Sequence, residues 1–284
     1  MIRSTDLMMI DLTSGTSQIP MIKILKLSTS EKNKSCFTLF IMDKLYTVPF
    51  KIRSYEVDHN ERSTLSSICN YFQEAAGIHA HHLNFDISQL HAKGLTWVLY
   101  KMHVIVDQRP KRWEDIDITT WPTAGDGLRA FRDYEMKSKN GEILARAVSQ
   151  WMVLDLKTKR PVRTPAEISK MGLTNRSHAV EPNKKQLETV TENKSVLITK
   201  VNDNDLDMNN HVNNVRYIDW MTGYLPNSLV DGKQCQEMEI QYLSESVKGD
   251  EIYLSYEQKA DTIQQTLFKN SDRKAIATSL SKWQ

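Results

Sequence analysis

The sequence predicts an α+β protein built from two copies of one unit, each a long helix wrapped by a curved antiparallel sheet. Apolar residues repeat at helical spacing through Thr64–Ala76 and again through Val212–Leu225. Runs of β-type residues follow both segments. A short Asp-x-Asn stretch that begins at Asp58, ahead of the first helix, recurs 149 positions later at Asp207, ahead of the second.

The strands of the first unit are predicted from alternating residues. In Trp97–Val106 every second residue from Val98 onward is apolar or aromatic, which places this set on one face. Asn140-Gly141 lies between two β-type runs and predicts a hairpin with a type I′ turn, in which both residues have positive φ. The expected strands are Tyr46–Phe50, Trp97–Val106, Asp115–Thr120, Leu128–Ser138 and Glu142–Leu156.

A polar linker is predicted between the two units. Thr164-Pro165-Ala166-Glu167 opens a short helix with Thr164 as its cap, and the polar stretch Asn175–Asn193 follows. Strands of the second unit are expected over Ser195–Lys200, Glu237–Leu243, Glu251–Glu257 and Thr262–Trp283. The chain then divides into an extension at 1–45, a first unit at 46–160, a linker at 161–193 and a second unit at 194–284.

Residues 1–45 differ from the rest of the chain. They hold clusters of Ser and Thr without sustained periodicity, so a disordered extension is expected, with a folded element as the alternative. Met42 stands just ahead of the first predicted strand, and we hypothesise that it is the natural start of the protein.

Composition excludes several classes of protein. The chain has 284 residues, of which 40% are hydrophobic, and no apolar stretch is long enough to span a membrane. A net charge of +2, from 37 basic and 35 acidic residues, argues against an obligate nucleic-acid binder. Three separated cysteines, Cys36, Cys69 and Cys235, predict neither a disulfide framework nor a zinc site, so we expect a cytoplasmic protein.

The segment before the second helix is the strongest candidate for chemistry. If it runs extended, Asp207, Asn209 and His211 point to the same side, at a helix N-terminus that favours developing negative charge. Such a place suits a carbonyl oxygen that becomes an oxyanion. The alternative is that these residues only build a turn and cap the helix.

A carboxylate could complete this site. Glu245 interrupts a strand-like run and could act as a general base toward water, although a solvated charge at a strand end is the simpler interpretation. In the first copy Arg62 stands opposite His211, and Arg109 falls near the position of Glu245. The first copy is therefore expected to be catalytically silent.

These residues carry a resemblance to a known family. Asp207-x-Asn-x-His-Val-Asn-Asn-Val-x-Tyr217, followed by Tyr242-x-x-Glu245, resembles the acyl-acyl-carrier-protein (acyl-ACP) thioesterases of plants and bacteria, and the likeness extends over Tyr46–Trp283. The resemblance implies a tandem, or double, hot-dog fold. It also implies hydrolysis of the thioester between a fatty acyl chain and the phosphopantetheine arm of acyl carrier protein, without a cofactor or a metal.

The resemblance assigns roles to four residues. Asn209 and His211 would hold and polarise the thioester carbonyl, Glu245 would activate water, and Asp207 would orient Asn209 or its loop. Many plant members have Cys where this chain has Ser246, so attack by water is favoured unless Ser246 or Cys235 acts as the nucleophile.

The resemblance also concerns the acyl chain and the carrier. The first unit would house the acyl chain, with Leu65, Ile68, Cys69 and Phe72 as candidate lining or plain core. Because acyl carrier proteins are strongly acidic, a cationic patch would steer the encounter. The candidate patches are Arg109, Lys111 and Arg112; Lys157, Lys159, Arg160 and Arg163; and Lys184 with Lys185.

Other functions stay open at this point. An acyl-CoA thioesterase or a hydroxyacyl dehydratase could use His211 and Glu245 on the same fold, and a non-catalytic acyl-binding protein could keep the fold alone. The oligomeric state is also open, with a homodimer as one option.

Overall fold

The computed structural model describes residues 45–123, 125–171, 176–191, 195–270 and 272–284. The extension predicted at 1–45 and the proposed start at Met42 lie outside these residues, apart from Leu45. Lys44–Gln284 form one compact unit. No helix within the described residues is long and apolar enough to cross a membrane.

Within the described residues, the first half of the chain supplies six strands and three α-helices. The strands are β1 (Tyr46–Lys51), β2 (Leu95–Val106), β3 (Asp115–Thr123), β4 (Arg129–Ser138), β5 (Ile143–Asp155) and β6 (Pro161–Val162). The helices are α1 (Leu65–His82), α2 (Ile87–His91) and α3 (Ala166–Met171). The prediction missed α2, and α1 extends six residues beyond the predicted end.

The second half repeats the pattern with fewer elements. Its strands are β7 (Val196–Lys200), β8 (Cys235–Tyr242), β9 (Glu251–Lys259), β10 (Thr262–Lys269) and β11 (Lys274–Trp283). Its helices are α4 (Asn214–Gly223) and the short α5 (Asn227–Val230). The run predicted to be β-type at Thr262–Trp283 forms a hairpin of two strands, β10 and β11.

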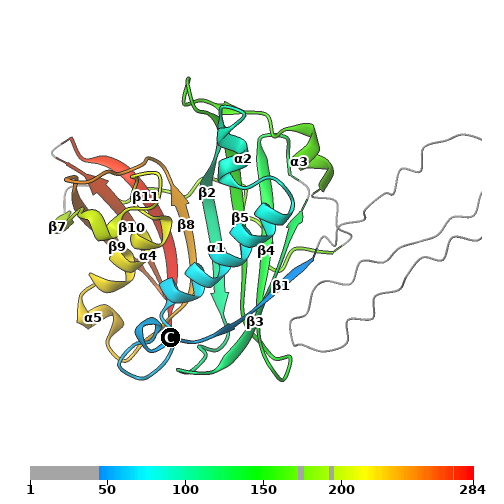
Figure 1. The fold of residues 1–284 in the computed structure, drawn as a ribbon. Helices are drawn as coiled ribbons and strands as arrows, with labels where there is room; N and C mark the ends of the chain where they lie inside the picture. The colour runs from blue at the N-terminus through cyan, green and yellow to red at the C-terminus, as the bar shows by residue number, and fades with distance from the viewer. Residues whose placement is uncertain (1–44, 124, 172–175, 192–194, 271) are drawn as a thin grey trace, which may run out of the picture. The chain divides into compact units, whose positions relative to one another are not determined.

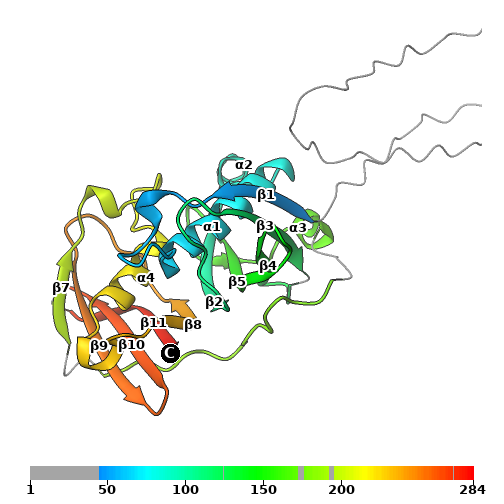
Figure 2. The same cartoon turned by 90° about the horizontal axis from the view of Figure 1, so that it is seen from below.

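All strands join in one antiparallel sheet with the order β1-β3-β4-β5-β2-β8-β11-β10-β9-β7, and β6 pairs with β5. The two halves meet where β2 pairs with β8, from Lys101 opposite Gln241 to Ile105 opposite Glu237. Figure 2 shows β1 to β5 curving around α1, which is the predicted arrangement of helix and sheet. One hydrophobic core includes residues of both α1 and α4, and the two helices contact each other. The predicted boundaries between the units stay a prediction, since sheet and core are continuous.

Side-chain caps set the N-terminal ends of the two long helices. The hydroxyl of Thr64 accepts a hydrogen bond from the backbone N–H of Ser67 at 3.1 Å and so caps α1. The amide oxygen of Asn213 accepts from the N–H of Val215 at 3.0 Å, so α4 begins two residues later than predicted.

Two local predictions in the sheet were wrong. The β4–β5 hairpin forms as predicted, but of the pair Asn140-Gly141 only Gly141 has a positive φ, so the turn is not type I′. In β2 the pairing with β5 shifts between Leu99 and Lys101, which leaves Tyr100 as a bulge. The bulge changes the phase of the alternation, so Leu99 and Met102 are buried whereas Val98 and Tyr100 are only half-buried.

The linker residues 176–191 contain no helix or strand and are fixed by polar side chains of the sheet. The ammonium of Lys101 is 1% exposed; it pairs with Glu239 at 3.0 Å and donates to the carbonyls of Asn183 and Lys185. Neighbouring residues of a strand point to opposite faces of the sheet. Met102 lies in the core with α1, so Lys101 and the linker that it contacts lie on the other face.

Candidate active site

The predicted catalytic segment before α4 is a tight loop, not an extended strand. The N–H of Asp207 donates to the carbonyl of His211 at 2.8 Å, and Asn210 has a φ of +61°. The carboxylate of Asp207 accepts from the N–H groups of Asn209 at 2.8 Å and His211 at 3.3 Å. The extended prediction failed because an Asp side chain can satisfy backbone donors locally and so replaces strand pairing. The alternative interpretation, a turn and a cap, describes the backbone correctly.

The loop before α1 has the same backbone. The N–H of Asp58 donates to the carbonyl of Arg62 at 2.8 Å, and Glu61 has a φ of +57°. The carboxylate of Asp58 accepts from the N–H groups of Asn60 at 2.8 Å and Arg62 at 3.1 Å. The internal repeat predicted from the sequence is thus present in the structure, since these backbone hydrogen bonds of the two loops correspond one to one.

The loop brings His211 to Glu245. The Nε2 atom of His211 lies 3.3 Å from Oε2 of Glu245, and the two side chains are 34% and 52% exposed. The amide of Asn209 lies next to the carboxylate of Asp207, with 3.5 Å between Nδ2 and Oδ2. The four predicted residues therefore form two contacting pairs, and the histidine–carboxylate pair is open to water and to a substrate.

The segment after β8 that carries Glu245 is held by three neighbouring elements. The ammonium of Lys269, at the end of β10, donates to the carbonyl of Glu245 at 2.7 Å and lies 3.6 Å from Asp250. Asp250 also accepts from the N–H of Val247 at 3.1 Å. The N–H of Val212 donates to the carbonyl of Ser246 at 2.9 Å, which ties this segment to the start of α4. Sequence reasoning missed Lys269 and Asp250, for which no local pattern gives a signal.

The two alternative nucleophiles lack a base. Ser246 is fully buried and its hydroxyl lies next to the phenol of Tyr217, while His211 pairs with Glu245 instead. Cys235 is 1% exposed, and burial raises the pKa of its thiol to about 12, so it stays protonated at neutral pH. Both observations favour attack by water.

In the first copy, arginines occupy the two positions that correspond to His211 and Glu245. The N–H of Ser63 donates to the carbonyl of Pro110 at 2.9 Å, the counterpart of the bond between Val212 and Ser246, so Arg109 corresponds to Glu245. The Arg109 guanidinium donates to the carbonyls of Ser63 at 2.9 Å and Cys235 at 2.8 Å. Arg62 donates to the carbonyl of Arg109 at 3.0 Å. The first copy thus has the loop without a histidine–carboxylate pair.

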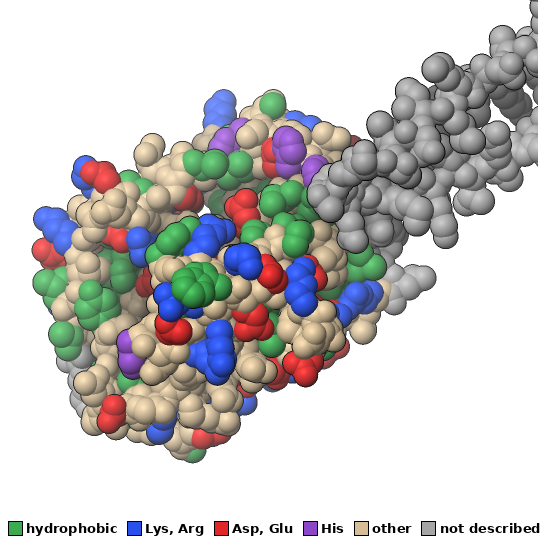
Figure 3. Space-filling model, turned by 60° about the horizontal axis from the view of Figure 1, so that its bottom comes forward, with side chains coloured by type: hydrophobic (Ala, Val, Ile, Leu, Met, Phe, Trp, Pro, Cys, Tyr) green, Lys and Arg blue, Asp and Glu red, His purple; other side chains and the backbone are tan. Residues whose placement is uncertain are grey.

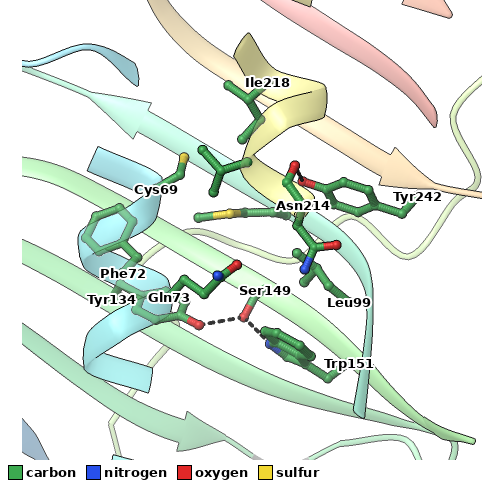
Figure 4. Close-up of a pocket in the computed structure, with 12 residues that line it drawn as sticks. Cys69, Phe72, Gln73, Leu99, Tyr134, Ser149, Trp151, Asn214, Ile218 and Tyr242 are labelled. Atoms are coloured by element: carbon green, nitrogen blue, oxygen red, sulfur yellow. Dashed lines mark hydrogen bonds between the residues drawn. The ribbon is translucent and has the colours of Figure 1, made fainter. Parts of the chain in front are cut away.

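A pocket lies between the two long helices and the sheet (Figure 4). Cys69 and Phe72 line it from α1 as the prediction expected, whereas Leu65 and Ile68 belong to the core instead. Asn214 at the start of α4 also lines it, three residues after His211. The remaining lining residues are Gln73, Leu99, Met102, Tyr134, Ser149, Trp151, Val215, Ile218 and Tyr242. Its free space is about that of one water molecule, so an acyl chain could enter only if these side chains move apart.

Two family models match this chain. The acyl-ACP thioesterase N-terminal domain matches residues 43–171, and the acyl-ACP thioesterase C-terminal domain matches residues 188–284. The chain belongs to the acyl-ACP thioesterase family. The resemblance seen in the motif around His211 is thereby confirmed for the family.

Two curated relatives from plants show the similarity. The chain is 29% identical to the chloroplastic oleoyl-acyl carrier protein thioesterase 1 of Arabidopsis thaliana, over 73% of this chain and 62% of that protein. It is 28% identical to the chloroplastic palmitoyl-acyl carrier protein thioesterase of Cuphea hookeriana, over 69% of this chain and 50% of that protein. The chain thus spans only part of the length of these relatives.

Solved structures show the same fold. An acyl-ACP thioesterase from Bacteroides thetaiotaomicron has a TM-score of 0.76 at 24% identity, covering 85% of this chain and 98% of that one. The 12:0-ACP thioesterase from Umbellularia californica has a TM-score of 0.77 at 22% identity, covering 86% and 98%. These likenesses confirm the predicted tandem hot-dog fold.

Proposed function

We propose that this protein hydrolyses the thioester that joins a fatty acyl group to acyl carrier protein. The observation that carries the proposal is the pair His211–Glu245 at 3.3 Å, presented to solvent by the Asp207 loop in a member of this family. The relatives act, by their names, on oleoyl and palmitoyl groups of acyl carrier protein.

The proposed mechanism uses water as the nucleophile. Glu245 accepts a proton from water, whose oxygen bonds to the carbonyl carbon of the thioester. Asn209 and His211 donate hydrogen bonds to the carbonyl oxygen as negative charge develops there. The C–S bond then breaks, and the thiolate of the phosphopantetheine arm takes the proton back from Glu245. Asp207 holds Asn209 and the loop in place.

The proposed compartment is the cytoplasm, where thiols stay reduced. Cys69 and Cys235 are both free and buried. The homodimer considered from the sequence is a separate proposal, which size-exclusion chromatography with light scattering tests directly.

The experiment measures release of free thiol from acyl carrier protein that bears C12 to C18 chains. His211→Ala and Glu245→Ala should each lower kcat by about 10²- to 10⁴-fold, because each removes a group that acts on the proton or the carbonyl. Arg62→Ala is the matched control, since Arg62 occupies the His211 position of the first copy. A His211 or Glu245 variant with full activity would remove that residue from the mechanism. Hydrolysis of acyl-CoA but not of acyl carrier protein substrates would favour an acyl-CoA thioesterase.

A further inference from the structure

Four exposed cations lie together without an ion-pair partner among the described residues: Lys93, Lys157, Lys159 and Arg160, here named the basic hairpin. The last three belong to the β5–β6 connection, and the N–H of Leu156 donates to the carbonyl of Gly94 at 2.8 Å, which joins this connection to Lys93. The nearby acids are engaged locally. Asp86 contacts His81 at 2.6 Å, and Asp155 accepts from the N–H groups of Lys157 and Thr158.

The basic hairpin and Glu245 lie at the same end of the sheet. β8 runs antiparallel to β2, with Gln241 near its end opposite Lys101 in the middle of β2, so the end of β8 and the beginning of β2 both point to the upper edge in Figure 1. Leu95, the first residue of β2, pairs with Asp155, just ahead of the hairpin. Glu245 follows Gln241 by four residues and leaves the sheet at this edge.

The other candidate patches are less suitable for docking. At the opposite end of the sheet, cations alternate with acids, as Figure 3 shows. Lys51 pairs with Asp115 at 2.8 Å, and Arg112 pairs with Glu61. Lys184 and Lys185 belong to the linker, on the face of the sheet away from the helices.

We propose that the basic hairpin is the docking surface for the acidic face of the carrier protein. This inference rests on the proposed function. The phosphopantetheine arm has about fourteen bonds between the carrier serine and the sulfur, and at the extension of a peptide chain it spans roughly 17 Å. A carrier protein docked on the basic hairpin directs this arm along the same edge of the sheet toward Glu245. Cations without a direct ion pair among the described residues attract an acidic partner, although Lys157 interacts with the neighbouring Asp155.

The test compares two double variants with wild type, on acyl carrier protein substrate and on acyl-pantetheine with the same chain. Lys157→Glu with Arg160→Glu should raise KM for the carrier-bound substrate about tenfold at low salt, with kcat unchanged. The effect should shrink at about 0.5 M salt, because ions screen exposed charges. Lys111→Glu with Lys233→Glu is the matched control, since both are exposed cations at the other end of β2 and β8. Acyl-pantetheine should be hydrolysed equally by all three proteins.

Two results overturn the proposal: a KM for carrier-bound substrate that changes no more than in the control, or an equal loss on acyl-pantetheine. Binding of unacylated carrier protein, measured by fluorescence anisotropy, separates this inference from the proposed function. If wild type binds the carrier and the Lys157/Arg160 variant does not, the surface stands even in a protein without hydrolytic activity. If wild type does not bind the carrier, the docking surface is refuted.

Discussion

Removing the buried ammonium of Lys101 should destabilise the protein more than any change at its surface. Lys101 is 1% exposed and makes three polar contacts: Glu239 at 3.0 Å and the carbonyls of Lys185 and Asn183. Lys101→Met keeps the length of the side chain but leaves a buried carboxylate with one remaining donor, Nδ2 of Asn183 at 3.0 Å. Loss of one partner of a buried pair costs about 3–5 kcal/mol.

The measurement is urea unfolding at pH 7, together with a double-mutant cycle. Lys101→Met should lower the free energy of unfolding by about 3 kcal/mol, equivalent to a Tm drop of roughly 6–12 °C in a chain of this size. Lys101→Met combined with Glu239→Leu should recover about half of this loss, because no charge stays unpaired. A loss below about 1 kcal/mol, or a double variant whose losses simply add, would refute the view that the linker is fixed by a buried ion pair.

Three more predictions concern the loops around the active site. Lys269→Ala should lower kcat about tenfold with little change in KM, measured by thiol release, and Lys269→Arg should restore most of it. Burial raises the pKa of Asp250, but hydrogen bonds from Asn270 and Val247 and the charge of Lys269 outweigh it, so the pKa lies below its usual value. Asp250 thus stabilises the protein above the usual Asp pKa, and thermal melts should show Asp250→Asn less stable at pH 7 but equal to wild type near pH 2. Asp58→Ala and Asp207→Ala should each lower the free energy of unfolding by about 1–2 kcal/mol in urea melts, yet only Asp207→Ala should lower kcat.

Much of the fold could be predicted because its signals are local. The spacing of the apolar residues predicts the buried face of α1, and the predicted strand boundaries lie within a few residues of those observed. The bulge at Tyr100 could not be predicted in this way, since it depends on how β2 pairs with β5, and those partners lie some fifty residues apart. The turn at Asn140-Gly141 failed for a similar reason, because Asn-Gly is compatible with more than one turn type.

The residues proposed for the site could be named from the sequence, but the residues that hold them in place could not. Asp207 and His211 stand in one short motif, and Glu245 follows it in the sequence. Lys269 comes from the end of β10, and only the folded sheet brings it to the carbonyl of Glu245. No periodicity or motif within β10 marks this lysine, so its role appears only when strands distant in sequence are neighbours in space.

The two loops show why a repeat in the sequence predicts a shared fold but does not predict a shared function. The carboxylates of Asp58 and Asp207 accept the same pair of backbone N–H groups, and this requirement is met whether the fourth residue after Asp is Arg or His. The backbone of the loop can therefore form with either side chain at this fourth position. What differs is the residue that faces it from the neighbouring segment. Arg109 turns to the carbonyls of Ser63 and Cys235, whereas Glu245 contacts His211. In the proposed mechanism, the chemistry thus depends on two side chains, His211 and Glu245, that the loop itself does not select.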